Sequence, residues 1–148
     1  APTPFFDFLP VSLGHYQDFH IKMHLYTFSF TSNYETLISV LLKGLDGIVF
    51  VADSRVEAMP ANFEALQRVK KVLSDEGYNF ANMPKVFQYN KRDSKDLVAL
   101  DILRSELNHA GAPDHEAIAT EAQGTMETLQ LIAKQLIKEL AISRDTYD

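Results

Sequence analysis

The stretch Val86-Phe87-Gln88-Tyr89-Asn90-Lys91-Arg92-Asp93 decides the fold, because an apolar run there ends abruptly in an Asn-Lys-x-Asp box. A second apolar run, Gly47 to Ser54, precedes this stretch, and a third element, Ala117 to Ala122, follows it and leads into a helical pattern. Strand-like runs that alternate with helical patterns predict an α/β fold with a mostly parallel sheet flanked by helices. In such sheets ligands bind outside the carboxyl ends of the strands, where this box falls.

The side chains of the box suit a guanine base. The carboxylate of Asp93 can accept two hydrogen bonds, from N1–H and the exocyclic amine of guanine, whereas adenine offers no such donor pair. The carboxamide of Asn90 can serve the base and its own loop, and the stem of Lys91 can lie along a planar ring while its ammonium stays in water. The alternative is a solvated turn after a strand, which the same residue types also form.

The remaining elements follow from periodicity and from glycine and proline positions. Two strands, Phe5 to Leu9 and Ile21 to Phe28, are predicted to pair antiparallel across a short link that contains Gly14. Apolar residues at helical spacing predict four helices, over residues 34–43, 60–76, 96–108 and 125–141. Pro60 suits the first turn of the second helix and Gly77 its end. A polar tail is expected from Ser143.

Composition limits the class of protein. The chain has 148 residues, of which 46% are hydrophobic and 23% charged, and this suits one globular domain with a core. A net charge of −6 argues against nucleic-acid binding, which needs a basic face. The sequence contains no cysteine and no apolar run long enough to span a bilayer, so we expect a soluble cytoplasmic protein.

Three segments together resemble the second half of a Ras-like small GTPase. They are residues 42–54, the Asn-Lys-Arg-Asp box and Thr120-Glu121-Ala122. Residues 5–10 and 24–27 narrow the resemblance to the bacterial gliding-motility polarity GTPases of the MglA type. The resemblance extends from Thr3 to about Leu140.

This resemblance implies a Ras-like P-loop NTPase domain over residues 1–142, followed by a polar C-terminal tail at 143–148. The residues that it assigns to guanine binding are Asn90, Lys91, Asp93, Glu121 and Ala122, with the Ala122 N–H directed to the base O6. It implies GTP or GDP with Mg²⁺, and Thr3 matches a metal-binding threonine of the first switch. Because Pro2 and Pro4 flank Thr3, a simple extended terminus is the alternative. The implied partners are a roadblock-type GTPase-activating protein and polarity effectors, which bind the switch face of a cytoplasmic, polar protein.

Two features of the sequence depart from the family pattern. The chain contains no Gly-x-x-x-x-Gly-Lys-Ser/Thr phosphate loop, and the first strand of the family is absent as well. Ser29-Phe30-Thr31 stands where the polarity GTPases carry Pro-Gly-Gln for γ-phosphate sensing and water positioning. We therefore expect weak or no GTP binding by this chain as written, and two unpaired strand edges where the missing strand belongs.

Two interpretations of these departures stay open: the chain is part of a longer protein, which we favour, or it is a degenerate relative. Enzymatic activity is left open. The function predicted is a guanine-nucleotide-dependent switch, and the alternative is a non-catalytic pseudo-GTPase scaffold that binds protein partners.

Two further expectations concern single residues. Asp53, at the end of its strand, either faces the nucleotide or caps the following loop, and we predict the cap. The aromatic residues of the first two strands exceed what one buried face needs, so some rings should be exposed and available to a partner.

Overall fold

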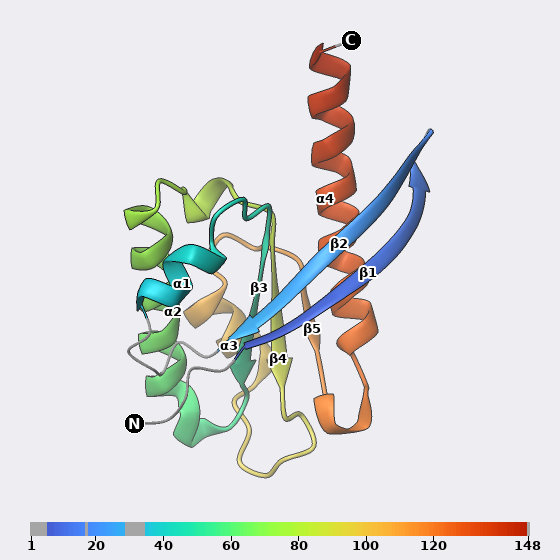
Figure 1. Cartoon of the computed structure of the whole chain (residues 1–148). Coiled ribbons are helices and arrows are strands. Elements are labelled where there is room, and N and C mark those ends of the chain that lie inside the picture. The colour runs from blue at the N-terminus through green and yellow to red at the C-terminus, as the bar shows by residue number, and fades with distance from the viewer. Residues whose placement is uncertain (1–5, 17, 29–34, 148) are drawn as a thin grey trace. The chain divides into compact units, whose positions relative to one another are not determined.

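The computed structural model describes residues 6–16, 18–28 and 35–147, and the chain divides into two compact units, residues 1–43 and 44–148. The first unit holds strands β1 (Phe6–Tyr16) and β2 (Phe19–Phe28) and helix α1 (Glu35–Leu41). The second holds strands β3 (Ile48–Asp53), β4 (Lys85–Asn90) and β5 (Asp114–Glu116) and helices α2 (Met59–Asp75), α3 (Leu100–Leu107) and α4 (Thr125–Tyr147) (Figure 1).

Strands β1 and β2 form an antiparallel hairpin, as predicted, but β1 is longer than expected. The prediction ended the first strand at Leu9, whereas pairing continues through Pro10, opposite His24, and on to Tyr16. Proline is tolerated here because each strand of a two-stranded ribbon has an unpaired edge. Gly14 is not in the link; its φ of +84° accompanies a register shift inside β1, as glycine does in a β-bulge.

The second unit is built on a parallel sheet in the order β3-β4-β5. The register pairs Asp53 at the end of β3 with Asn90 at the end of β4. Among the described residues β3 pairs with β4 alone, so its other edge carries no strand, and β1 and β2 form a separate sheet. This sheet confirms the predicted α/β class with a parallel sheet flanked by helices.

Helices cover both faces of the parallel sheet, with α2 and α3 on one side and α4 on the other (Figure 1). Neighbouring residues of β4 alternate between these faces. Gln88 donates from Nε2 to Oγ1 of Thr128 on α4 at 2.9 Å, whereas the Tyr89 hydroxyl donates to Oδ2 of Asp114 at 2.9 Å. The apolar residues of the core are almost fully enclosed; they include Leu66, Leu73, Val86, Phe87, Leu103, Leu107 and Ile132.

Helix α2 has the boundaries that its sequence signals predict. Pro60 lies in the first turn, where a missing N–H is harmless. At the other end Gly77 adopts φ +86°, its N–H bonds to Ser74 O, and the N–H of Tyr78 bonds to Leu73 O at 2.9 Å. This pair of bonds is a Schellman motif, which requires the left-handed conformation that glycine adopts without strain.

Helix α3 begins later than predicted, at Leu100 instead of Asp96. Backbone groups of residues 96–98 bond to the segment that follows β3: Asp96 O accepts from Val56 N at 2.9 Å, and Val98 N donates to Ser54 O at 2.8 Å. Asp96 itself has a φ of +54°, which a right-handed helix excludes. The apolar periodicity from Leu97 onward therefore overstated the helix at its first turn.

Helix α4 begins at Thr125, as predicted, and extends to Tyr147 instead of ending near Ala141. Residues 143–147 of the expected polar tail are thus helical in the structure. In addition to the bond between Gln88 and Thr128, two hydrogen bonds join this helix to the sheet: Gln135 accepts from Lys85 N at 3.1 Å and donates to Lys85 O at 2.9 Å.

Candidate guanine-binding site

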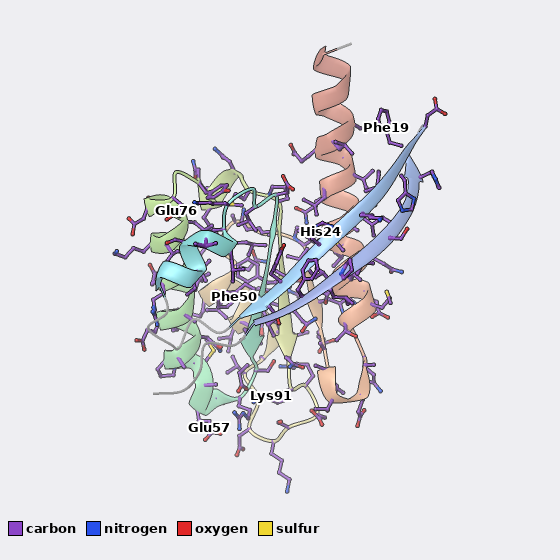
Figure 2. The ribbon with its side chains drawn as sticks, in the orientation of Figure 1. Phe19, His24, Phe50, Glu57, Glu76 and Lys91 are labelled. Atoms are coloured by element: carbon purple, nitrogen blue, oxygen red, sulfur yellow. The ribbon has the colours of Figure 1, made fainter. Side chains whose placement is uncertain are left out.

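The candidate site lies where the parallel strands end and three loops begin, after β3, β4 and β5. The ends coincide because Asp53 and Asn90 are register partners. Figure 2 shows Glu57 and Lys91 at this end of the sheet. The structure therefore places the Asn-Lys-x-Asp box at the carboxyl edge, the position from which such sheets bind ligands.

Asn90 connects the box to the loop that follows β5. Its Oδ1 atom accepts a hydrogen bond from the backbone N–H of Ala119 at 2.9 Å, and its backbone carbonyl accepts from Ser54 N at 3.0 Å. One residue thus holds together the segments after β3, β4 and β5. The box is thereby brought next to the turn at 119–121, which leads to Glu121 and Ala122, the other residues that the sequence assigned to guanine binding.

Lys91 has an unusual backbone conformation and a paired side chain. Its φ is +65°, in the left-handed region that residues with a Cβ seldom adopt. The chain turns sharply here, and Ser94 N donates to Lys91 O at 3.0 Å. The ammonium Nζ lies 3.0 Å from Oδ2 of Asp53, so the box is joined to the end of β3 by an ion pair.

Asp53 caps the loop after β3, which confirms that prediction. Its Oδ1 accepts from the backbone N–H of Arg55 at 3.1 Å, and the Arg55 guanidinium donates to both carboxylate oxygens, at 2.7 Å for Nη2 to Oδ2. Hydrogen bonds from Arg55, together with Lys91, hold the pKa of Asp53 well below its usual range despite partial burial. The carboxylate therefore stays ionised and also faces the box through Lys91.

Asp93 differs from its neighbours in the box because its carboxylate has no bonding partner among the described residues. It is exposed, and among the described residues its carboxylate makes no hydrogen bond or ion pair. Both oxygens are thus available as acceptors for a ligand. Within the box, the side chains of Asn90 and Lys91 bind other parts of the protein, whereas the carboxylate of Asp93 binds none of the described residues.

Residues 119–121 form a 3-10 turn that ends at Ala122, which has φ +54°. The N–H of Ala122 donates to Ala119 O at 3.1 Å, so the donor that the resemblance directs to a base O6 is used inside the turn. The carboxylate of Glu121 accepts from Nε2 of Gln123 at 3.3 Å. Both residues are exposed at the carboxyl edge of the sheet.

Arg92, the variable position of the box, has a structural role that the sequence did not reveal. Its Nη1 donates to Val98 O at 2.8 Å, its Nε lies 3.3 Å from a carboxylate oxygen of Glu116, and its backbone N–H donates to Ala117 O at 3.2 Å. Arg92 therefore ties the box to the segment before α3 and to the end of β5. An arginine between two box residues carries no sequence signal of these partners.

Some predictions concern parts of the chain that the structure does not describe. Thr3, the candidate Mg²⁺ ligand, and Ser29-Phe30-Thr31 lie outside the described residues. Over the described ranges, no group of three or more His, Cys, Asp or Glu side chains is arranged to hold a metal. None of the helices in these ranges combines the length and the apolar character that crossing a membrane requires.

No protein-family model matches the sequence. Among curated proteins, the chain is similar to the Mutual gliding-motility protein MglA of Myxococcus xanthus (strain DK1622), with 43% identity over 138 residues. The aligned region is 93% of this chain and 71% of that relative.

Proposed function

The chain belongs to the Ras-like small GTPases of the MglA type, and on this premise we propose that it reads the guanine base in a nucleotide-dependent switch that controls cell polarity or gliding motility. Asn90, Lys91 and Asp93 are the base-reading residues, and Glu121 and Ala122 form the adjoining loop. The ligand is GDP or GTP with Mg²⁺.

The observation that carries this proposal is the uncommitted carboxylate of Asp93 beside two anchored neighbours. Because Asn90 bonds to Ala119 and Lys91 pairs with Asp53, the loop is held in shape before any ligand arrives. With the loop backbone held in place, only the Asp93 side chain has to be ordered when its carboxylate accepts from N1–H and the exocyclic amine of guanine, which lowers the cost of binding. A solvated turn would not need either anchor.

The second loop supports the same ligand through its backbone. The N–H of Ala122 bonds to Ala119 O within the turn, and a shared, three-centre hydrogen bond would let it also donate to the base O6. The bond between Asn90 and Ala119 keeps this loop beside the box. The two loops are thus adjacent, so that Asp93 can accept from N1–H and the exocyclic amine while the Ala122 N–H donates to O6 on the same edge of the base.

We assign the phosphates to a different part of the fold, the free edge of β3. This strand is apolar along most of its length, yet Val51 is 53% exposed and the edge carries no strand among the described residues. A further parallel strand paired with β3 would complete a Ras-like sheet and end beside Asp53, with a phosphate loop following it. In this proposal residues 1–142 belong to one Ras-like domain, and Thr3 is a Mg²⁺ ligand.

The test is a titration of fluorescent GDP and GTP, with Mg²⁺, against this polypeptide and against any longer polypeptide that contains it. Binding that is competed by unlabelled GDP and not by ADP supports guanine recognition. Binding by the longer form alone assigns the phosphates to the additional segment. Absence of binding by either form would overturn the switch and leave the second candidate.

The second candidate is a pseudo-GTPase scaffold that binds protein partners without nucleotide cycling. Ser29-Phe30-Thr31 favours it, because a phenylalanine and a threonine stand at the glycine and glutamine positions of the family. The hairpin offers exposed rings, with Phe8, Phe19 and Tyr26 at 48%, 55% and 44% exposure, which confirms that part of its aromatic surplus lies outside. A roadblock-type partner that binds equally well with and without GTP would favour the scaffold over the switch.

A further inference from the structure

The carboxylate of Asp53 is shared by two cations from different loops. Nη2 of Arg55 and Nζ of Lys91 both contact Oδ2, at 2.7 Å and 3.0 Å. Arg55 also pairs with Glu57 at 3.1 Å. Asp53 and Glu57 carry two negative charges, and Arg55 and Lys91 carry two positive charges. Because Glu57 offsets the charge of Arg55, Asp53 still attracts Lys91.

The backbone of Asp53 is fixed as firmly as its side chain. Asn62 on α2 donates from Nδ2 to Asp53 O at 2.8 Å and accepts from Asp53 N at 3.1 Å. Asn62 is 7% exposed, so water competes little for these two bonds. The carboxylate therefore projects from a rigid point at the end of β3.

Lys91 is held at both ends of its side chain. Its backbone is set in a left-handed turn, and its ammonium is bound at the rigid carboxylate. A free lysine stem samples many rotamers, and ordering them opposes ligand binding. With both ends fixed, the stem between them is already ordered before a base arrives.

We propose that Asp53 is a positioning residue for guanine recognition: its ion pair with the ammonium directs the Lys91 stem along the plane of the base. This inference rests on the proposed function, because it concerns how that same site selects its ligand. Asp53 touches Lys91 and not the base. The hydrogen bonds from Arg55 keep the Asp53 carboxylate ionised and fix its orientation. The carboxylate in turn fixes the position of the Lys91 ammonium in the box.

The experiment is a double-mutant cycle in GDP affinity, made in the form of the protein that binds GDP. Asp53→Asn keeps an oxygen that can accept from Arg55 N but removes the charge that holds Lys91. We expect a loss of affinity of about fivefold, the size of one partly exposed ion pair. In the background of Lys91→Met, which retains an apolar stem without the ammonium, Asp53→Asn should change the affinity less than twofold.

Three further variants separate positioning from general effects of charge and of loop structure. Asp75→Asn removes the same charge and breaks a lysine–aspartate pair of similar length, 3.1 Å to Lys71, on the exposed side of α2, and it should leave GDP affinity unchanged. Arg55→Met removes the other partner of Asp53 and should cost less affinity than Asp53→Asn, because the pair with Lys91 remains. Asp53→Glu should recover part of the loss.

Each outcome is decisive. Coupling between residues 53 and 91 in GDP affinity supports the inference. An equal loss from Asp53→Asn in both backgrounds would overturn it while leaving guanine binding intact, because Asp53 would then act through the loop structure alone. Failure of the unsubstituted protein to bind GDP in any form would overturn the proposed function, and the inference with it.

Discussion

The side chain of Asn90 accepts a hydrogen bond from the backbone N–H of Ala119 at 2.9 Å, although 29 positions separate the two residues in the chain. Because Asn90 ends β4 and Ala119 begins the turn after β5, this bond links the two loops that the proposal assigns to the base. The asparagine of the box is thus first a structural residue, and its contribution to a ligand depends on this link.

Asn90→Ala should therefore damage ligand binding more than it damages folding. The variant leaves the Ala119 N–H without its partner, which costs about 1 kcal/mol of stability. The loop at 119–122 also loses its attachment to the box, and we expect GDP affinity to fall by about tenfold or more. Amide hydrogen exchange at Ala119 and a GDP titration measure the two effects separately.

Asn79→Ala is the matched control for that variant. Asn79 also accepts a hydrogen bond from a backbone N–H in a 3-10 turn, that of Ala81 at 3.1 Å, but this turn precedes β4 at the opposite end of the sheet. It should lose similar stability and no affinity. An equal loss of affinity in both variants would mean that Asn90 acts through overall stability.

Asp93→Asn should shift the base preference of the site from guanine towards xanthine. An asparagine side chain can accept one hydrogen bond but donates the other, so it suits xanthine, which presents N1–H beside a carbonyl, better than guanine. We expect GDP affinity to fall by about tenfold or more, and xanthosine diphosphate to bind better than it binds the unsubstituted protein. Competition titrations with both nucleotides measure this exchange.

Asp46→Asn is the control for that prediction, because Asp46 is an exposed carboxylate that precedes β3 at the other end of the sheet. It should bind both nucleotides like the unsubstituted protein. Unchanged GDP affinity in Asp93→Asn would contradict the assignment of Asp93 to the base.

The ion pairs of Asp53 predict a pH-dependent contribution to stability. Hydrogen bonds from Arg55 and the charge of Lys91 lower the folded-state pKa of Asp53, so the ionised carboxylate stabilises the fold at every pH above the unfolded-state pKa, near 4. Below about pH 4 the unfolded state binds the proton first, and the contribution declines as pH falls towards the folded-state pKa.

The measurement is the free energy of unfolding in urea for the unsubstituted protein and for Asp53→Asn, at pH 7 and pH 3. The stability difference between the two proteins should be smaller at pH 3, because the other carboxyl groups contribute equally to both. A difference that is the same at both pH values would show that these ion pairs do not stabilise the fold.

The sequence predicted those parts of the fold that local signals determine. Strand β3 is apolar up to Asp53 and β4 is apolar apart from a few polar residues, while α2 has a proline in its first turn and a glycine just after its end, and both act as expected. The predicted start of α3 was wrong because the N–H of Val98 and the carbonyl of Asp96 bond to residues 54 and 56. Such long-range bonds leave no trace in helical periodicity.

In the candidate site too, local sequence signals predicted some features, whereas others depend on long-range contacts. The box itself and the cap at Asp53 follow from residue type and position, and the structure brings the box and the 119–122 loop together through Asn90. The partners of Arg55 and Arg92 could not be predicted, because a long cation selects among several oxygens only after the loops are folded. The left-handed conformation of Lys91 depends on the same folded loops.

Gly124 fixes where α4 meets the end of β5, and it should tolerate no side chain. Its φ is +79°, and a Cβ atom placed there would lie 2.0 Å from Glu116 O and 2.9 Å from Ala117 Cα. These are backbone atoms, so no side-chain rotation can relieve the overlap. Gly124→Ala should lower the free energy of unfolding by about 3 kcal/mol or more, because backbone strain and steric overlap both contribute.

Gly77→Ala separates those two contributions. Gly77 has a similar φ of +86°, but a Cβ there would meet nothing within 4 Å. Its substitution should cost only the conformational strain of a left-handed alanine, about 1 kcal/mol. Urea denaturation of both variants measures the difference, which is the cost of the overlap with Glu116. If the two variants lost equal stability, the loop from 117 to 124 would be free to move away from β5, and the fixed relation between the Ala119 turn and the Asn-Lys-x-Asp box would not hold.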